Sequence, residues 1–449
     1  MTFKEGLLGA RSHLVFLLAI IFSFALILRL EGVETGPTEF LELEAEAPKP
    51  PTHHLDSQHE EWARIAWRYF EKNERASTGL VDSVSGYPAT TLWDTGSYLL
   101  AIIAAHRLEI IDQYEADRRL EAALGSLEKM PLVAERPAGG LPNKSYNTET
   151  LNMVDYNNQA APEGIGWSAI DAGRLMVPLH VLVWHYPQHT SQVRRVFDQW
   201  DFSRLVRDGT LFGGQLDETA RPESESVRYS LVQEGRLGYE EYSARAFALG
   251  GLDTSVASRF TDFLRWVPVF DERIATDSRD ARDYVAHNVV VSEPYVLDGL
   301  ELGFDRVTKE LAFRVFKAQQ QRYESTGVLT AVSEDHLDRP PHFAYYGVVA
   351  DGKLWHAIDS NGRDADDART LSTKTAFGWH ALFTSRYTKL LLEDVRSLHD
   401  PEGGWYAGRY EESAEANDLL TCNTNAVVLE SLHYMAFGPM VRFSNFERL

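Results

Sequence analysis

The feature that most constrains the fold is a local design that the chain repeats six times. Each repeat has a loop rich in glycine and aromatic residues, then a polar or acidic residue, then an apolar helix. The last repeat, 403–436, opens with the sequence GGWY, and the sequence TCNTN precedes its helix, 426–436. Threonine and asparagine favour helix starts because their side chains accept hydrogen bonds from free backbone N–H groups. We therefore expect six apolar helices, each with a polar loop at its N-terminal end.

A second set of helices separates the six apolar ones. Helices that are apolar nearly all round are expected inside a protein, and helices with one apolar stripe are expected to cover them. The predicted inner helices span or open at 92–106, 164–185, 238–242, 291–295, 372–379 and 424–436. The predicted outer helices begin at 60 or span 114–130, 192–206, 254–266, 304–323 and 387–398. Twelve alternating helices predict an all-α fold, an (α/α)6 barrel, and the uneven repeat spacing argues against a helical solenoid.

One segment departs from the helical pattern. Two runs of alternating and aromatic residues, 343–349 and 354–358, flank Asp351 and Gly352. An Asp-Gly pair between two such runs indicates a β-hairpin. We expect this small hairpin to be an insertion over the mouth of the barrel.

The N-terminal region predicts export. Residues 14–28 are apolar apart from Ser23, and the stretch reaches 30 if Arg29 extends its charge to the membrane surface. Basic residues precede this stretch and glutamates follow it, which places the N-terminus in the cytoplasm and the body outside. We expect a membrane anchor or signal at 1–30, an acidic and proline-containing linker at 31–57, and the helical domain at 58–449. Whether the anchor is cleaved stays open.

Composition excludes several classes of function. The net charge of −22 argues against a surface for nucleic acid or anionic lipid. A single cysteine, Cys422, allows neither an intramolecular disulfide nor a cysteine-based zinc site. The stretch 364–367 matches the DxDD pattern of class II terpene cyclases, but it lies in a polar segment that we interpret as a solvated loop. We predict no metal and no cofactor.

The inner-helix openings of a barrel converge at one end, and so would their acidic and aromatic residues. Glycoside cleavage uses two carboxyl groups, one to protonate the leaving oxygen and one to activate water or attack carbon. We predict four catalytic candidates, with the first two preferred: Asp94, Glu411, Glu293 and Asp171. The predicted sugar-binding residues are Trp93, Trp167, Glu241, Tyr242, Trp379, Trp405, Tyr406 and Asn425. The competing interpretation is that these acids only cap helices or interact with helix dipoles.

Four blocks of sequence carry a resemblance to a known family. Residues 91–101, 378–388, 403–411 and 420–439 resemble an exported bacterial family catalogued as domain of unknown function 3131, over about 60–439. That family is similar to the glycoamylase-like (α/α)6-barrel enzymes, which include the family 144 endo-β-1,2-glucanases. The resemblance implies a toroidal helical fold with a cleft for carbohydrate.

These observations lead to one hypothesis and two rivals. The hypothesis is a glycoside hydrolase that acts on a glucan or an envelope polysaccharide, anchored in the bacterial inner membrane by 14–30 with its body in the periplasm. The first rival is a non-catalytic polysaccharide-binding or scaffold subunit of an envelope polysaccharide machine, with its acids held by arginines or helix caps. The second, less favoured, is a polysaccharide lyase with Tyr242 or His380 as base.

Overall fold

The computed structural model describes residues 45–46, 48, 51–133, 140–216, 229–234, 236–280 and 286–441. Ala45–Leu449 form one compact unit. The predicted membrane segment, 14–30, and most of the predicted linker lie outside the described residues. Among the helices of the described part, none is long and apolar enough to cross a membrane.

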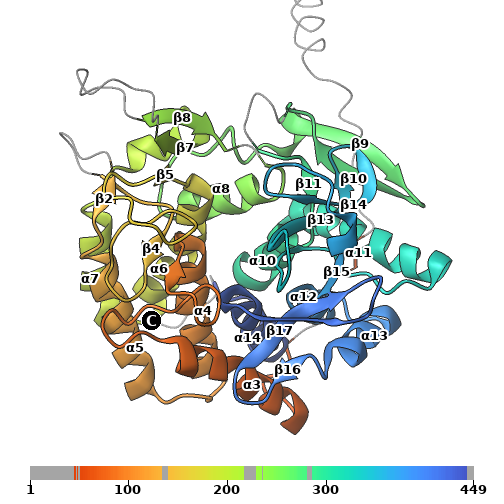
Figure 1. The fold of residues 1–449 in the computed structure, drawn as a ribbon, viewed down its shortest axis with the longest axis horizontal. Helices are drawn as coiled ribbons and strands as arrows, with labels where there is room; N and C mark the ends of the chain where they lie inside the picture. The colour runs from red at the N-terminus through yellow and green to blue at the C-terminus, as the bar shows by residue number, and fades with distance from the viewer. Residues whose placement is uncertain are drawn as a thin grey trace, which may run out of the picture. The chain divides into compact units, whose positions relative to one another are not determined.

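Six buried helices form a closed ring (Figure 1). They are α4 (Leu92–Arg107), α6 (Ala169–His185), α8 (Tyr239–Leu249), α10 (Glu293–Leu297), α12 (Thr373–Leu382) and α14 (Cys422–Phe437). Each helix packs against the next one in the chain, and α14 packs against α4. A π-helical turn, Asp298–Leu302, extends α10. The six predicted inner helices are therefore confirmed, and their closure makes an α/α ring.

Outer helices cover this ring from outside. They are α3 (Ser57–Asn73), α5 (Gln113–Leu127), α7 (Thr190–Phe197), α11 (Arg306–Thr326) and α13 (Arg386–Val395). The helix α3 packs on α14, and the other four pack on α4, α6, α10 and α12 respectively. Each outer helix buries one apolar face, as α3 does with Ala63, Ala66, Tyr69 and Phe70.

The predicted outer helix at 254–266 is wrong. The segment contains a 3-10 turn, Phe260–Phe263, followed by strand β9 (Leu264–Val269), which pairs with β10 (Glu272–Asp277). The sequence Val267-Pro268-Val269 favours an extended chain because proline has no backbone N–H and valine is branched at Cβ. The predicted helix at 192–206 is also too long, since α7 ends at Phe197. The described residues thus provide five outer helices.

The loops before the inner helices contain more β-structure than one hairpin. The predicted hairpin is confirmed as β13 (Phe343–Ala350) and β14 (Lys353–Asp359), but it belongs to a four-stranded sheet with β11 (Val289–Val290) and β12 (Glu334–His336). A second four-stranded sheet contains β5 (Gly166–Trp167), β6 (Val206–Arg207), β7 (Thr210–Leu216) and β8 (Tyr229–Gln233). A third contains β15 (Thr370–Ser372), β16 (His399–Asp400), β17 (Gly404–Tyr410) and β18 (Ala416–Leu420). Two short pairs are β1 (Ala89–Thr90) with β4 (Tyr146–Asn147) and β2 (Leu132–Val133) with β3 (Leu141–Pro142). The expectation of an all-α fold with one small hairpin is corrected accordingly.

Two glycines explain how closely the inner helices approach. A Cβ atom on Gly96 of α4 would lie 3.1 Å from the backbone of Leu175 in α6. A Cβ atom on Gly173 of α6 would lie 2.8 Å from the backbone of Ser243 in α8. A larger residue at either position would push neighbouring inner helices apart, so these glycines set the spacing around the site described next.

Candidate active site

Two aspartates occupy the same position in neighbouring inner helices. The helix α4 is capped by Thr91, and α6 is capped by Ser168; each cap side chain accepts a hydrogen bond from the backbone N–H three residues later. Those third residues are Asp94 and Asp171. Negative charge is favourable in the first turn of a helix, which is why the sequence places carboxylates there. The packing of α4 against α6 then brings the two helix starts together.

Asp171 has an unusual environment. It is half-buried, and no described residue donates a hydrogen bond to its carboxylate. Its pKa is raised to about 7, chiefly by burial and also by the charges of Glu234, Asp94 and Glu334, against the opposing charge of Lys144. A carboxyl group with this pKa is about half protonated at neutral pH, so it can donate a proton there.

Asp94 is held differently. Its carboxylate accepts hydrogen bonds from the hydroxyl groups of Ser83 and of Thr91, the latter at 2.9 Å. The residue is 8% exposed. Asp94, which accepts two hydroxyl hydrogen bonds, and Asp171, whose pKa is raised to about 7, thus offer two carboxyl groups in different environments at adjacent helix starts.

Glu234 explains part of the difference. It follows strand β8, and its Oε2 accepts hydrogen bonds from the backbone N–H groups of Ala169 (2.5 Å) and Ile170 (3.1 Å) at the start of α6. A carboxylate from a distant segment therefore satisfies the free N–H groups that a helix leaves at its N-terminus. The sequence-based analysis missed Glu234, because it lies in the polar stretch 208–235 and far from α6 in the chain.

The side chains next to the two aspartates are aromatic and apolar. Three half-buried residues, Trp93, Ile170 and Tyr345, pack against a small buried cluster. The cluster consists of Tyr239, Val289, Val291, Ala350 and Ile358. The Trp93 ring lies edge-on to Tyr239 at 5.5 Å between centroids, and the guanidinium of Arg174 lies 5.3 Å from its centroid. Trp93 is thus the one predicted tryptophan that keeps part of its surface exposed beside the two aspartates.

A second charged group contains Glu293. Its carboxylate forms an ion pair with Lys374 Nζ (2.5 Å) and accepts a hydrogen bond from Asn423 Nδ2 (2.7 Å). Lys374 also lies 3.3 Å from Asp335. Burial raises the pKa of Asp335 to about 6 and that of neighbouring Glu334 to about 7. Lys374 was not predicted, although a lysine at the start of an otherwise apolar helix is a detectable signal.

Glu411 does not join this group. Its carboxylate forms two hydrogen bonds with Arg322 of the outer helix α11 (2.6 and 2.8 Å) and accepts one from Tyr346 Oη (2.8 Å). These partners lower its pKa despite its burial. It lines a cavity of about 280 Å³ with Arg409 and the turn 327–329. The carboxylate of Glu411, one of the two preferred catalytic candidates, is therefore bound by an arginine, as the scaffold hypothesis expected of the acids.

Most of the predicted sugar-binding residues pack the core. The fully or almost fully buried ones are Trp167, Glu241, Tyr242, Trp379, Trp405 and Asn425. Trp379 donates its indole N–H to Ser292, and Trp405 donates its own to the carbonyl of Trp62. Tyr242 contacts Glu301 and Arg174 through its hydroxyl. The structure thus places these six side chains in the packed interior, with almost no exposed surface. Tyr406 is half-buried on β17.

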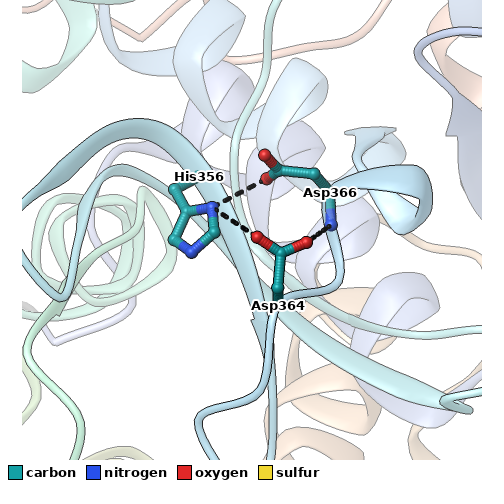
Figure 2. A group of neighbouring side chains, drawn as sticks. All are labelled: His356, Asp364 and Asp366. Carbon is teal, nitrogen blue, oxygen red and sulfur yellow. Dashed lines mark hydrogen bonds and ion pairs between the residues drawn. The ribbon is translucent and has the colours of Figure 1, made fainter.

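The DxDD stretch contributes a local cluster (Figure 2). His356, Asp364 and Asp366 are the one group of described residues that brings three potential metal-ligating atoms within 4.8 Å. His356 Nδ1 lies 2.9 Å from Asp366, which also accepts the N–H of Ala357 at 2.8 Å. The side chain of Asp364 is 66% exposed. These bonds close the loop after β14 and account for the cluster without a ligand.

The ring fold is shared with carbohydrate enzymes of low sequence identity. An endo-β-1,2-glucanase from Chitinophaga pinensis, solved with sophorotriose and glucose, is similar over 86% of this chain and 93% of its own, with 12% identity and a TM-score of 0.60. A provisionally assigned glucoamylase from Bacteroides fragilis is similar over 87% and 94%, with 13% identity and a TM-score of 0.60. An endo-β-1,2-glucanase from Talaromyces funiculosus, solved with sophorose, is similar over 86% and 84%, with 11% identity and a TM-score of 0.55. At these identities the likeness shows the fold alone.

Sequence comparison identifies the family. Curated protein sequences give no match. A family model described as "Protein of unknown function (DUF3131)" matches residues 61–438, which contain both aspartates and the whole helical ring. The chain therefore belongs to this family, as the four resembling blocks of sequence indicated.

Proposed function

We propose that this protein is a glycoside hydrolase in which Asp94 and Asp171 together cleave a glycosidic bond of a glucan. The observation that carries the proposal is the contrast between the two carboxyl groups. No described residue donates to the carboxylate of Asp171, whose pKa is raised to about 7, whereas two hydroxyl groups donate to that of Asp94. Pairs of carboxyl groups whose environments differ in this way are typical of glycosidases.

Each aspartate has a defined part in the proposed reaction. Asp171 donates its proton to the glycosidic oxygen as the bond from that oxygen to the anomeric carbon breaks. Asp94 either removes a proton from the water that attacks this carbon or attacks the carbon itself, followed by water. The anomeric configuration of the first product, read by proton NMR, distinguishes inversion from retention.

The surroundings supply what a sugar site needs. Trp93 keeps a partly exposed aromatic ring, and the half-buried Asn423 offers an amide group that donates to Glu293. The solved structures of similar fold include endo-β-1,2-glucanases, which supports β-1,2-glucan as the first substrate to test.

The experiment compares glucan cleavage by the full chain and three variants. Wild-type protein is incubated with β-1,2-, β-1,3- and β-1,4-glucans, and released oligosaccharides are measured by mass spectrometry. We expect Asp171→Asn and Asp94→Asn each to lower the rate by about 10²- to 10⁴-fold. Glu411→Gln should retain cleavage, because its carboxylate is bound by Arg322.

Two outcomes would contradict the proposal. If Glu411→Gln abolishes cleavage in a folded protein while Asp171→Asn does not, the acid has been misplaced. If wild-type protein binds glucans and releases nothing, the scaffold function is favoured, since Glu411 already has the arginine partner that it predicts.

Residues 14–30 are proposed to anchor the protein in the bacterial inner membrane with its body in the periplasm. The support is the apolar sequence with basic residues before it and acidic residues after it. Membrane fractionation of cells that express the full chain or a chain lacking 1–30 tests this. Recovery of both proteins in the same soluble fraction would contradict it.

A further inference from the structure

A cavity of about 280 Å³ lies at the end of an outer helix, away from the two aspartates. Its walls are the turn 327–329, which follows α11, together with Arg409 and Glu411 at the end of strand β17. Neither of the proposed catalytic aspartates is among the described residues that line it. Gly327 is exposed and Val328 is half-buried, so the cavity is open to solvent. The proposed bond cleavage gives this cavity no part.

The walls of the cavity are held in place by one arginine. Arg322 Nη1 donates to the carboxylate of Glu411 (2.6 Å) and to the hydroxyl oxygen of Thr330 (2.7 Å), just after the turn. Thr330 in turn donates to the carbonyl of Val328 at 2.9 Å. Gly327 ends α11 with φ +77°, a left-handed conformation that glycine adopts without strain. The carboxylate and the turn are therefore fixed relative to each other, which lowers the entropic cost of binding a ligand between them.

The two charged groups of the wall are each half of an ion pair. Glu411 pairs with Arg322, and Arg409 pairs with Asp394 at 2.5 Å. A cationic ligand would meet Arg409 and an anionic ligand would meet Glu411, so a charge of either sign meets a like charge in this cavity. An uncharged ligand meets no such penalty and leaves both ion pairs intact.

Both charged groups keep part of their hydrogen-bonding capacity. The carboxylate of Glu411 accepts two hydrogen bonds from Arg322 and one from Tyr346, whereas a carboxylate has about four acceptor positions. Among the described residues, Arg409 donates twice to Asp394 and once to a backbone carbonyl, which leaves other N–H hydrogens of its guanidinium available. The cavity thus offers an acceptor and donors together. Sugar hydroxyl groups match this arrangement, because each hydroxyl group can donate and accept.

The rest of the wall is apolar. Val328 and Leu329 contribute half-buried aliphatic side chains. A mostly apolar wall with a few convergent polar groups is typical of small-molecule sites, whose volumes are about 300–1,000 Å³. The volume of about 280 Å³ lies just below that range, which suits one sugar ring rather than several.

We propose that this cavity binds one uncharged sugar unit of a glycan, and that it holds the glycan without cleaving it. Hydroxyl groups of the sugar donate to Glu411 and accept from Arg409, and its C–H groups face Val328 and Leu329. Two separate points of attachment raise the affinity for a long chain without any new contact at the aspartates. This gain for long chains rests on the proposed function, whereas the binding of a sugar unit does not.

Carbon-13 methyl NMR of the full chain observes this cavity directly. The methyl groups of Val328 and Leu329 are labelled, and their signals are assigned from the spectra of Val328→Ile and Leu329→Ile. The probes share one ring and differ in charge: the methyl β-glycosides of glucose, glucuronic acid and glucosamine. We expect methyl β-glucoside to shift both signals, and the two charged glycosides to need at least about tenfold higher concentrations for the same shift.

Two variants test the assignment of the walls. Val328→Trp fills the cavity and removes no polar group. Arg409→Lys keeps the positive charge beside Asp394 but loses the planar array of N–H groups. Each variant should weaken the binding of methyl β-glucoside by about tenfold, read from the signal of Leu329.

Each variant has a matched control. Val307→Trp makes the same change at a valine that is 39% exposed near the start of α11. Arg396→Lys makes the same change at an arginine whose side chain is 55% exposed and pairs with Glu393. Both controls should bind methyl β-glucoside with the wild-type affinity. Thermal unfolding of all four proteins shows whether they remain folded.

The outcomes separate this inference from the proposed function. Unmoved methyl signals with methyl β-glucoside, an equal or stronger response to a charged glycoside, or unchanged affinity in both wall variants would overturn the sugar site, even if glucans are cleaved. Shifted signals without cleavage of any glucan would support the sugar site and overturn the hydrolase. If the protein is a hydrolase, Val328→Trp should raise KM for a long β-1,2-glucan about fivefold and leave kcat unchanged. An unchanged KM would overturn the proposed gain for long chains.

Discussion

The starts of α4 and α6 are alike in sequence and different in chemistry. Each has a hydroxyl-bearing cap and an aspartate three residues later. Around Asp94, two hydroxyl groups donate to the carboxylate. Around Asp171, Glu234 occupies the N–H groups of the helix start, and the aspartate keeps a raised pKa near 7. One local pattern thus produces two carboxyl groups with different surroundings, depending on which other side chains reach each helix start.

The largest expected effect depends on the leaving group of the substrate. This dependence distinguishes Asp171, the proposed proton donor, from Asp94. Asp171→Asn should lower cleavage of a natural glucan by about 10²- to 10⁴-fold, because the departing oxygen no longer receives a proton. With a nitrophenyl glycoside, whose leaving group needs no proton, the loss should shrink to less than about tenfold. Asp94→Asn should lower both rates equally. Steady-state rates on both substrates measure this, and equal behaviour of the two variants would remove the distinction.

The second prediction concerns the residue that joins the two helices. Arg174 follows Asp171 by one turn, is completely buried, and contacts Glu301, Glu430 and Ser97. Arg174→Met leaves two buried carboxylates without their cation, which should lower the free energy of unfolding by about 3–5 kcal/mol. Urea unfolding measures the change.

A matched control for Arg174 is Arg118, whose side chain is 41% exposed and pairs with Glu74 and Glu115. Arg118→Met should cost less than about 1 kcal/mol. Similar losses in both variants would show that the buried cluster does not hold the helix starts together.

The third prediction removes a charge that helps to raise the pKa of Asp171. Glu234→Gln keeps an oxygen that can accept from Ala169 and Ile170 but removes a negative charge near Asp171. The pKa of Asp171 should fall, because Glu234 is the leading charge that raises it. A proton donor with a lower pKa loses its proton at lower pH, so the descending limb of the activity profile should move to lower pH.

Carbon-13 NMR of the aspartate carboxyl groups measures the pKa of Asp171 even without activity, with Asp171→Asn for assignment. Glu163→Gln, on the same loop as Tyr156, serves as a charge-matched control. It should leave the descending limb of the pH–activity profile at nearly the same pH. An unchanged Asp171 pKa in Glu234→Gln would show that burial alone raises it.

The smallest expected effect comes from a change next to Asp94. Ser83→Ala removes one of the two hydroxyl donors to Asp94. The carboxylate should lose orientation, and kcat should fall about fivefold, as expected for one hydrogen bond of about 1 kcal/mol. The descending limb should stay in place, because Asp171 is untouched. A larger loss than in Asp94→Asn would mean that Ser83 has a part of its own.

The local features of this chain were predictable because their causes are local. The apolar pattern of α4 and α14 predicts buried helices, the TCNTN sequence predicts the start of α14, and Asp351-Gly352 predicts the hairpin. Periodicity and capping act within a few residues, so a sequence read alone contains them. The same logic placed Asp94 and Asp171 on one end of the ring.

Tertiary structure decided which of these residues remain available for chemistry. Glu411 meets Arg322 across 89 residues, and Glu234 meets Ala169 across 65. Trp379 and Trp405 share the aromatic character of Trp93, yet packing buries the first two completely and leaves the third partly exposed. Burial and ion pairing depend on partners that arrive from far along the chain, and no local pattern specifies them. The sequence by itself determined the ring and the two helix-start aspartates, whereas long-range contacts decided which carboxyl group keeps its proton.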